Sequence, residues 1–365
     1  MPLSGPNANV GPALQRAAAL GLGTGGPVLD VRDTGGTPTG AAAAAQAALD
    51  GGADLILGPL TSGETGAVAP LATARGIAVL AFTNDPAQAQ PGVWPLGVTP
   101  LQQVRRLMDA ARSQGRMRVA ALLPASEFGR AMGRALEAAA PASGVSVVRQ
   151  VTYEGNFNAV NEAVRSVSGY ASRRGPLDAQ IRALRNRGDA AGRREAQQLA
   201  RRSVPPPDFD LLLLAESGSR LREITAMMPY YDIDPPTVRV IGPAIWQAEA
   251  ATLGRDGALV GGWFAASDPE ARAEFVSAYQ SAHGNDPPRI ADIAFDAAAI
   301  ARVAAGRGGY NVASLTAPEG FTGAGGLVAL LPGGEVRRGL ALFEIERRGA
   351  QMVEPAPETL AAPGL

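Results

Sequence analysis

Residues 55–64 read LILGPLTSGE: an apolar run, a Gly-Pro break, and then small hydroxyl residues ahead of an acid. The apolar run is typical of a buried strand, and the small polar residues are typical of a helix start. If the helix begins near Ser62 or Gly63, then Thr61, Ser62 and the free amides of the first turn form an anion site that suits a ligand carboxylate. Alternatively, Thr61 or Ser62 only caps the helix. Both interpretations fit this stretch equally well.

The sequence on both sides of this stretch alternates between helical patterns and short apolar runs, which is the order of β-α-β units with a parallel sheet. Before residue 94 we expect helices at 10–22, 39–52 and 62–76, and strands at 27–33, 54–59 and 77–82. The pattern then restarts, with helices at 101–113 and 129–144 and strands at 118–124, 145–153, 209–217 and 237–243. The sequence therefore predicts an α/β fold with two doubly wound parallel-sheet lobes.

The last third of the chain returns to helices, which we expect at 244–254, 268–284 and 290–305, with a strand-like run at 258–266. Residues 326–349 have the pattern of a β-hairpin that turns at residues 332–334. His283 stands at a helix end, where a following glycine gives the stop and a cation suits the dipole. We expect residues 352–365 to form a loose end.

Residues 168–203 interrupt the alternation with nine arginines against three acids. Because both signs of charge are present, we favour a solvated helical insertion. The other interpretation is a docking arm for an anionic partner. Three prolines at 205–207 end the insertion before the next strand.

Composition excludes several classes of protein. At 365 residues the chain is long enough for two cores, and no apolar run approaches the roughly 18 residues that would span a bilayer. A net charge of -1 gives no field that would gather nucleic acid. The chain has no cysteine and a single histidine, so we expect no disulfide, no multi-histidine metal site and no cofactor.

Catalytic motifs give little support for an enzyme. Residues 21–26, GLGTGG, follow a helix and precede a strand, which is the reverse of the dinucleotide-binding order, so we interpret them as a helix end and loop. A catalytic triad would have to recruit His283 from a helix terminus. Asp292 and Asp296 stand four residues apart, as exposed or first-turn acids commonly do. We therefore expect no catalytic residues and no enzymatic activity.

A second strand ends in polar residues, because Phe82, Thr83 and Asn84 follow the apolar run at 77–82. The carboxyl ends of parallel strands are where open sheets bind ligands, so this turn and the turn at Thr61 face one crevice. Each aromatic residue alone is more typical of a core than of a ligand contact. The second half of the chain supplies the candidates for the opposite wall: Phe128, Tyr153, Glu216, Ser217, Trp246 and Trp263.

Several segments together resemble the type I periplasmic solute-binding family, in particular its branched-chain amino-acid-binding group. They are PLSGPNANVG at 2–11, the signature at 33–38 and 44–85, PASEFGRAMGRALE at 124–137, FDAAAIAR at 295–302 and the closing part at 320–345. The resemblance covers nearly the whole chain, and its motifs are specific as an ordered set.

The resemblance implies two lobes joined by three crossing strands, which trap a small ligand by hinge closure. It implies a first lobe of residues 1–97 and 244–323, a second lobe of 98–243 and 324–352, and a tail of 353–365. The crossings are expected near residues 96–98, 243–245 and 322–326. The carboxylate-binding hydroxyls of the family match Thr61, Ser62 and Thr83, and its ligand-covering aromatic matches Phe128. The full set of expected ligand-binding residues is Thr61, Ser62, Phe82, Thr83, Phe128, Glu216, Ser217 and Trp246.

The sequence departs from the family pattern at three places. Ala244 replaces an acid that commonly holds the ligand ammonium, an aromatic expected near Ser217 is missing, and the strand that precedes PLSG in the family is absent from this sequence. The arginine-rich insertion resembles the branch of penicillin-binding-protein activators, which are lipoproteins that regulate peptidoglycan synthases.

The resemblance implies a monomeric periplasmic receptor that delivers an amino-acid-like ligand to the permease of an ABC transporter. The alternative is a regulatory lipoprotein whose partner is a cell-wall synthase. The resemblance implies a periplasmic location, and attachment by a lipid anchor on a removed N-terminal segment is an alternative that the sequence leaves open. Nucleic acid is not an expected partner.

Overall fold

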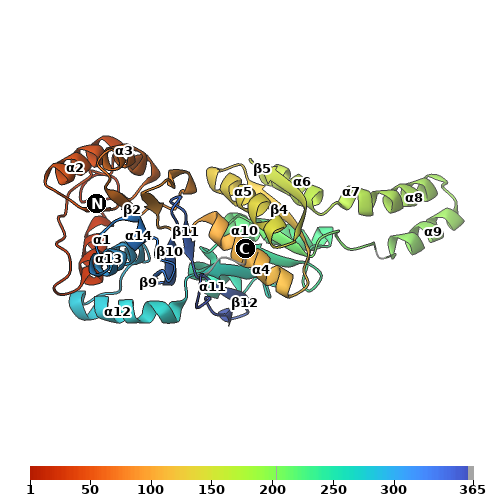
Figure 1. The fold of residues 1–365 in the computed structure, drawn as a ribbon. Coiled ribbons are helices and arrows are strands. Elements are labelled where there is room, and N and C mark those ends of the chain that lie inside the picture. Colours follow the sequence, from red (N-terminus) through yellow and green to blue (C-terminus); the bar gives the residue numbers. More distant parts are fainter. Residues whose placement is uncertain (203, 361–365) are drawn as a thin grey trace. The chain divides into compact units, whose positions relative to one another are not determined.

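The computed structural model describes residues 1–202 and 204–360, which fall into two compact units (Figure 1). Unit 1 comprises Met1–Gln102, Ser267–Ala341 and the described residues from Pro355 on. Unit 2 comprises Gln103–Ala266 and Leu342–Glu354. Both units are α/β in composition, so the predicted fold class is confirmed.

The boundary of unit 2 differs from the expected one at residues 244–266, which were expected in the first lobe. These residues belong to unit 2 because β8 (Trp263–Ala266) pairs in parallel with β7 (Arg239–Gly242). The segment also contains α11 (Trp246–Leu253), which packs on β13 (Gly349–Glu354) of unit 2, so strand pairing and helix packing agree.

Residues 324–341 differ in the opposite sense, because they were expected in the second lobe and lie in unit 1. Here β10 (Gly326–Leu330) pairs with β9 (Phe321–Gly323) on one side and with β11 (Val336–Arg338) on the other. The chain passes from one unit to the other at residues 102–103, 266–267, 341–342 and 354–355.

Unit 1 is built on a parallel sheet of three strands in the order β1-β2-β3, with a separate antiparallel sheet in the order β11-β10-β9. The parallel strands are β1 (Leu55–Leu57), β2 (Ala78–Ala81) and β3 (Val93–Pro95). The helices are α1 (Gly11–Leu22), α2 (Pro38–Asp50), α3 (Ser62–Thr73), α12 (Pro269–His283), α13 (Ala291–Gly306) and α14 (Val312–Leu315), with a short 3-10 helix, η1 (Pro86–Gln88).

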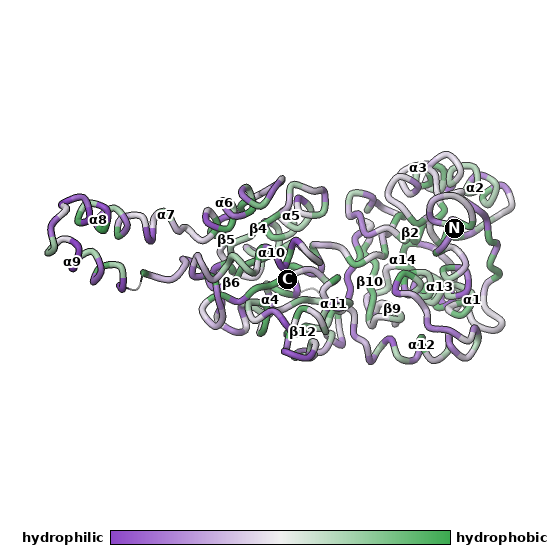
Figure 2. Tube along the Cα trace, turned by 180° about the vertical axis from the view of Figure 1, so that it is seen from behind, coloured by the Kyte–Doolittle hydropathy of each residue, from purple (hydrophilic) through white to green (hydrophobic). Residues whose placement is uncertain are grey.

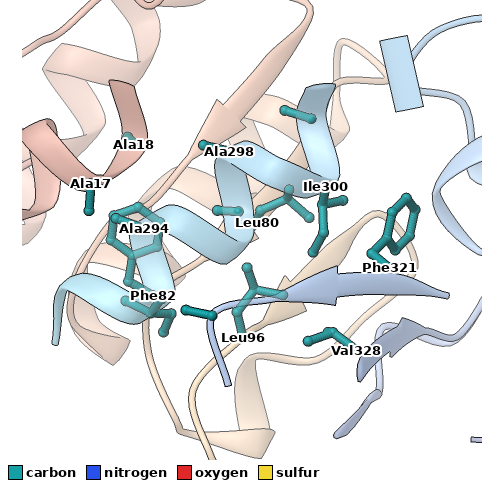
Figure 3. Close-up of a cluster of buried hydrophobic side chains, with 14 of the residues drawn as sticks. Ala17, Ala18, Leu80, Phe82, Leu96, Ala294, Ala298, Ile300, Phe321 and Val328 are labelled. Carbon is teal, nitrogen blue, oxygen red and sulfur yellow. The ribbon is translucent and has the colours of Figure 1, made fainter. Parts of the chain in front are cut away.

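The parallel sheet of unit 1 is covered on both faces, as the continuous apolar strands predict. Leu80 of β2 packs with α1 and α13, whereas its neighbour Val79 packs with α2 and α3. Figure 3 shows Leu80 beside the small residues of α13 in the first of these clusters. A Cβ at Gly21 of α1 would lie 2.6 Å from the carbonyl oxygen of Phe295 in α13, so the two helices approach closely only because that side chain is absent.

Unit 2 is built on one seven-stranded sheet in the order β13-β12-β8-β7-β6-β4-β5. Its further strands are β4 (Arg118–Pro124), β5 (Ser146–Tyr153), β6 (Leu211–Leu214), β12 (Ala341–Glu346) and β13 (Gly349–Glu354). The helices that accompany it are α4 (Pro100–Ser113), α5 (Glu127–Ala142), α6 (Phe157–Val167), α10 (Gly218–Met227), η2 (Met228–Tyr231) and α11 (Trp246–Leu253).

The arginine-rich insertion is helical, as predicted. It consists of α7 (Tyr170–Arg173), α8 (Gly175–Asn186) and α9 (Ala190–Ala200), and α8 packs on α9 as a hairpin (Figure 2). The contact between α8 and α9 buries Ile181 and Ala196. We call α8 and α9 with their connecting turn the arm.

Two predicted elements are wrong. Residues 27–33 form no strand, because a strand needs a hydrogen-bonded neighbour and the described main-chain bonds of this segment reach only Met1. Residues 352–354 are not loose but belong to β13, which pairs with β12; residues 361–365 lie outside the described part.

The helix end at His283, followed by Gly284 in the left-handed region, and the hairpin turn after β10 are confirmed. Gly23 ends α1 within the GLGTGG loop, as expected. Across residues 1–202 and 204–360, no helix has the length and apolar character needed to cross a membrane.

A buried ion pair holds three parts of unit 1 together. The Asp296 carboxylate of α13 lies 2.7 Å from the Arg338 guanidinium of β11, and both side chains are almost fully buried. Asp296 also accepts a hydrogen bond from the Ala324 amide, and Arg338 donates one to the carbonyl of Leu96, just after β3. Asp296 is therefore a structural acid in the core and not the exposed residue that its spacing from Asp292 suggested.

We predict that Asp296→Ala lowers the free energy of unfolding by about 3–5 kcal/mol, because it leaves the buried Arg338 charge without its partner. Asp30→Ala is the matched control, since its pair with Arg32 is largely exposed and is expected to contribute less than about 1 kcal/mol. Urea unfolding followed by circular dichroism measures both. Equal losses for the two variants would contradict the role given to Asp296.

Candidate functional site

The residues that follow the strands of unit 1 meet at one edge of its parallel sheet. The Phe82 amide donates to the Pro59 carbonyl at 2.8 Å, and the Gly97 amide donates to the Thr83 carbonyl at 2.9 Å. The turns after β1, β2 and β3 are thereby joined in order, as the shared direction of parallel strands requires. The predicted convergence of the Thr61 and Thr83 turns within unit 1 is confirmed.

Thr61 serves as the N-cap of α3, which is the second of the two interpretations given to its stretch. Its hydroxyl accepts the Glu64 amide at 3.2 Å, and the Glu64 carboxylate accepts the Thr61 amide at 3.0 Å. This reciprocal capping box engages the Thr61 side chain with the helix itself. A direct contact between Thr61 and a ligand stays a prediction.

Ser62 and Thr83 come together through an acid that the sequence analysis did not single out. The Ser62 hydroxyl donates to the Asp85 carboxylate at 2.5 Å and accepts from the Gln88 side-chain amide at 3.0 Å. The Thr83 hydroxyl accepts the Asp85 amide at 3.1 Å. We call Ser62, Thr83, Asp85 and Gln88 the unit 1 half-site.

The sequence around Asp85 contains a signal for a helical turn. The stretch TNDPAQ places an aspartate directly before a proline, which is a common way to begin a helical turn. In the structure Asp85 caps η1, with its carboxylate accepting the Ala87 amide at 3.0 Å. That turn carries Gln88 back to Ser62.

The unit 1 half-site combines hydrogen-bond donors with one negative charge. The amides of Ser62 and Gly63 stand in the first turn of α3, where backbone N–H groups have no partner within the helix. The positive end of the helix dipole adds to them. Phe82, by contrast, is almost fully buried and packs in the core cluster that also contains residues of α1 and α13.

In unit 2, the turn after β6 is held by two aromatic side chains. The Tyr153 hydroxyl donates to the Glu216 carboxylate at 2.5 Å, and the Trp246 indole donates to the Glu216 carbonyl at 2.7 Å. Ser217 begins α10, and no hydrogen bond from its side chain caps that helix. The structure thus brings four residues together at one edge of the unit 2 sheet: Tyr153, Glu216, Ser217 and Trp246. We call these four residues the unit 2 half-site.

Trp246 has no exposed surface in this structure. Its ring lies over Gly242, where a Cβ would come within 2.2 Å of the ring carbons. Trp263 is equally buried, and its indole donates to Glu344. Both tryptophans are core residues. Any effect of Trp246 on a ligand would therefore be indirect, through its hydrogen bond to the Glu216 carbonyl.

Phe128 differs from the other aromatics because 40% of its surface is exposed. It lies in the first turn of α5, which Ser126 caps by accepting the Gly129 amide at 3.1 Å. An aromatic ring held on a capped helix end and open to solvent suits contact with an apolar or aromatic ligand. That contact remains a prediction.

Electrostatics in the unit 2 half-site favour a protonated tyrosine. Burial raises the pKa of Tyr153, and the Glu216 carboxylate that accepts its hydrogen bond raises that pKa further. The Arg220 guanidinium acts in the opposite direction and donates to the Gly155 carbonyl at 3.2 Å. Within the part of the chain that the structure describes, no cluster of three or more metal-ligating side chains occurs.

Comparison with known proteins identifies the type of fold. Residues 1–168 match the family model described as periplasmic binding protein. A curated relative, an uncharacterized protein of Rickettsia prowazekii (strain Madrid E), is 28% identical over 117 residues, which is 32% of this chain and 31% of the relative. The chain thus matches less than a third of the length of that relative.

Solved structures are similar over nearly the whole chain. A candidate branched-chain amino acid ABC transporter from Rhodospirillum rubrum has a TM-score of 0.72 at 21% identity, with 96% of this chain and 97% of that chain covered. A substrate-binding protein of Desulfitobacterium hafniense in complex with Leu has a TM-score of 0.61 at 16% identity, covering 94% and 95%. A solute-binding protein of Rhodopseudomonas palustris BisB5 in complex with 3,4-dihydroxybenzoic acid has 0.56 at 18% identity, covering 97% and 94%. The type I periplasmic binding protein fold is therefore shown.

Proposed function

We propose that this chain, with its periplasmic-binding-protein match over residues 1–168 and the fold of type I binding proteins, is a periplasmic receptor for a small carboxylate-bearing ligand. The ligand would be delivered to the permease of an ABC transporter, without chemical change. The observation that carries this proposal is the unit 1 half-site, where Ser62, Thr83 and the first turn of α3 converge at the carboxyl edge of a parallel sheet.

A ligand carboxylate would be held by hydrogen bonds from the α3 amides and the Thr83 hydroxyl, and from the Ser62 hydroxyl once it turns from Asp85 to the ligand. The ligand contacts that the sequence predicts for Phe128 and Glu216 stay predictions. Binding favours a closed state only by the difference in affinity between the open and closed forms.

Two ligand classes are suggested by the similar structures, one bound to Leu and one bound to an aromatic acid. An amino acid carries an ammonium group, which needs a nearby negative charge, whereas a benzoate-like acid carries none. Asp85 supplies such a charge within hydrogen-bond distance of Ser62. Since Ala244 lacks a carboxylate, we favour Asp85 as the acid of an amino-acid-binding site.

We predict that the double variant Ser62→Ala, Thr83→Ala weakens ligand binding by at least tenfold, because each lost hydrogen bond to a carboxylate is worth about 1.5–3 kcal/mol. The matched control is Ser281→Ala, Thr316→Ala, which removes the same two residue types elsewhere in unit 1. The Ser281 hydroxyl donates to the Ser277 carbonyl of α12, and the hydroxyl of Thr316, the C-cap of α14, donates to the Val312 carbonyl. Titration calorimetry against a panel of amino acids and aromatic acids measures both. Unchanged affinity in the first variant would contradict the proposed site.

Asp85→Asn separates the two ligand classes, because it removes a negative charge and keeps the size of the side chain. If the ligand is an amino acid, we expect affinity to fall by at least tenfold, since the ammonium loses its counter-charge. Affinity for a benzoate-like acid is expected to stay equal or to rise. The same calorimetric panel provides the measurement, with Asp268→Asn, the half-buried N-cap of α12, as control.

A second candidate function, an interaction module for a cell-wall synthase, draws support from the arm alone. Arg173 anchors the base of the arm by donating to Asp232 and to the carbonyls of Pro205, Tyr231 and Ser168. Seven exposed arginines lie on or beside the arm: Arg182, Arg185, Arg187, Arg193, Arg194, Arg201 and Arg202. A firmly based and positively charged hairpin suits an anionic protein surface.

We predict that replacing Arg182, Arg185, Arg193 and Arg194 by glutamine abolishes any salt-sensitive binding to a purified peptidoglycan synthase and leaves ligand affinity unchanged. Lys-for-Arg replacements at the same four positions are the control, because they keep the charge. Biolayer interferometry at two salt concentrations measures the partner, and calorimetry measures the ligand. Absence of synthase binding by the unmodified protein would remove this second function and leave the receptor role untouched.

A further inference from the structure

The arm of unit 2 is held together mainly by its own two helices. The helices α8 and α9 pack on each other, and α8 also packs on α7. Figures 1 and 2 both show the hairpin extending away from the unit 2 sheet. Two short helices outside a core can cover only part of their apolar surface, so the side chains around each helix indicate which further surface the arm can bury.

Each helix of the arm carries one apolar stripe. Its members follow one another after four and then three residues, as core positions of helix bundles do. The six members are Leu177, Ile181 and Leu184 of α8 and Gly192, Ala196 and Leu199 of α9. Ile181 and Ala196 are buried, whereas the three leucines are only half-buried. The contact between α8 and α9 therefore leaves part of both stripes uncovered.

The residues that α9 places against α8 are small, which explains the uncovered surface. A Cβ at Gly192 would lie 2.6 Å from the Leu184 carbonyl oxygen, so the two helices approach closely only because that side chain is absent. Ala196 adds only a methyl group. Leucine side chains on α8 thus have no partner of their own size on α9.

The half-buried leucines lie on one face of the hairpin. At about 100° per residue, Leu177 and Leu184 are turned about 40–60° to one side of Ile181. Leu199 is turned about 60° in the same sense from Ala196. In two antiparallel helices that face each other, rotation in the same sense leads to the same face. Both stripes therefore point toward the centre of a bundle with further helices on that face, which we call the leucine face.

The arginines of the arm lie on the opposite face. Arg182 and Arg185 are turned about 40–100° to the other side of the α8 stripe, and Arg193 is turned about 60° to the other side of the α9 stripe. We call these three residues the arginine face. The charges at the edge of the leucine face are paired, because the Arg187 guanidinium lies 3.7 Å from the Glu195 carboxylate across the hairpin.

We propose that the leucine face binds the leucine face of a second copy of this chain, so that two arms form a four-helix bundle. A two-fold contact uses the same surface twice, and an apolar surface with paired charges at its edge is complementary to itself. Stacked in this way, the two arms keep their arginine faces on opposite outer sides, where like charges do not meet.

Charge also distinguishes this occupant from an acidic helix of another protein. Such a helix would gain its ion pairs on the arginine face and not on the leucine face. The dimer leaves both arginine faces open to an anionic partner, and the inference does not depend on the receptor role. Each helix is only about 16–18 Å long, so the interface is small and we expect a dissociation constant of about 10–100 µM. At low concentration the chain is then the monomer that the resemblance implies.

The first test uses the unmodified protein without added ligand. Between about 5 and 500 µM, sedimentation is expected to show a weight-average mass that rises from the 37.3 kDa of one chain toward twice that value. Over the same range, hydrogen exchange at the amides of residues 177–199 is expected to slow by about fourfold, while exchange in β4 stays unchanged.

The second test identifies the face that makes the contact. The chain has no cysteine, so introduced thiols can react only with each other. The double variant Gln180→Cys, Glu195→Cys places thiols at the edge of the leucine face, turned toward the second copy. Its matched control, Arg182→Cys, Gln197→Cys, places them at equal rotation on the arginine side. Under mild oxidation only the first is expected to give a disulfide-linked dimer.

Adding Leu184→Glu to the first cysteine pair is expected to lower the yield of linked dimer by at least tenfold, because it places a charge in the centre of the bundle. A mass of one chain at every concentration, with exchange of residues 177–199 that does not depend on concentration, would overturn the proposal. Disulfides formed equally on both faces, or only on the arginine side, would overturn it as well. Either outcome leaves the receptor role untouched, since no ligand takes part in these measurements.

Discussion

The direction shared by parallel strands is the constraint on which the candidate site depends. Because β1, β2 and β3 run the same way, their following turns must lie on one edge, and the Phe82 and Gly97 amides join those turns by hydrogen bonds. Ser62 and Asp85 are 23 residues apart in sequence and meet there at 2.5 Å. No single motif creates this cluster; the sheet does.

The cap of the helix that begins at this edge and the proposed anion site use different groups. Thr61 and Glu64 satisfy each other and fix where α3 begins, and this capping box does not use the Ser62 and Gly63 amides. The cap therefore positions those amides, which the proposed ligand carboxylate would use, without occupying them. The cap interpretation of the LILGPLTSGE stretch is confirmed at Thr61, whereas the anion site at Ser62 and the first-turn amides stays a prediction.

Local sequence predicted most of the fold, since strongly periodic segments such as 10–22 and 290–305 became α1 and α13. It was wrong where pairing depends on distant residues. The apolar stretch 27–33 has strand character but lacks neighbours, and residues 244–266 follow β8 into unit 2. Ser62 and Thr83 were predicted because they follow strands, whereas Asp85 and Gln88 required the turn that brings η1 back to α3. Burial of Trp246 depends on the missing side chain of Gly242, which no helical or strand period reveals.

Neither unit is a continuous stretch of the chain, and this affects how the protein is made. The apolar face of α1 packs on α13, which begins about 270 positions after α1 ends. At the usual 5–20 residues per second of synthesis, that face waits roughly 13–55 s for its partner. The first half of unit 1 thus emerges with uncovered alanine and leucine surface, a state that holding chaperones can bind before the native core closes.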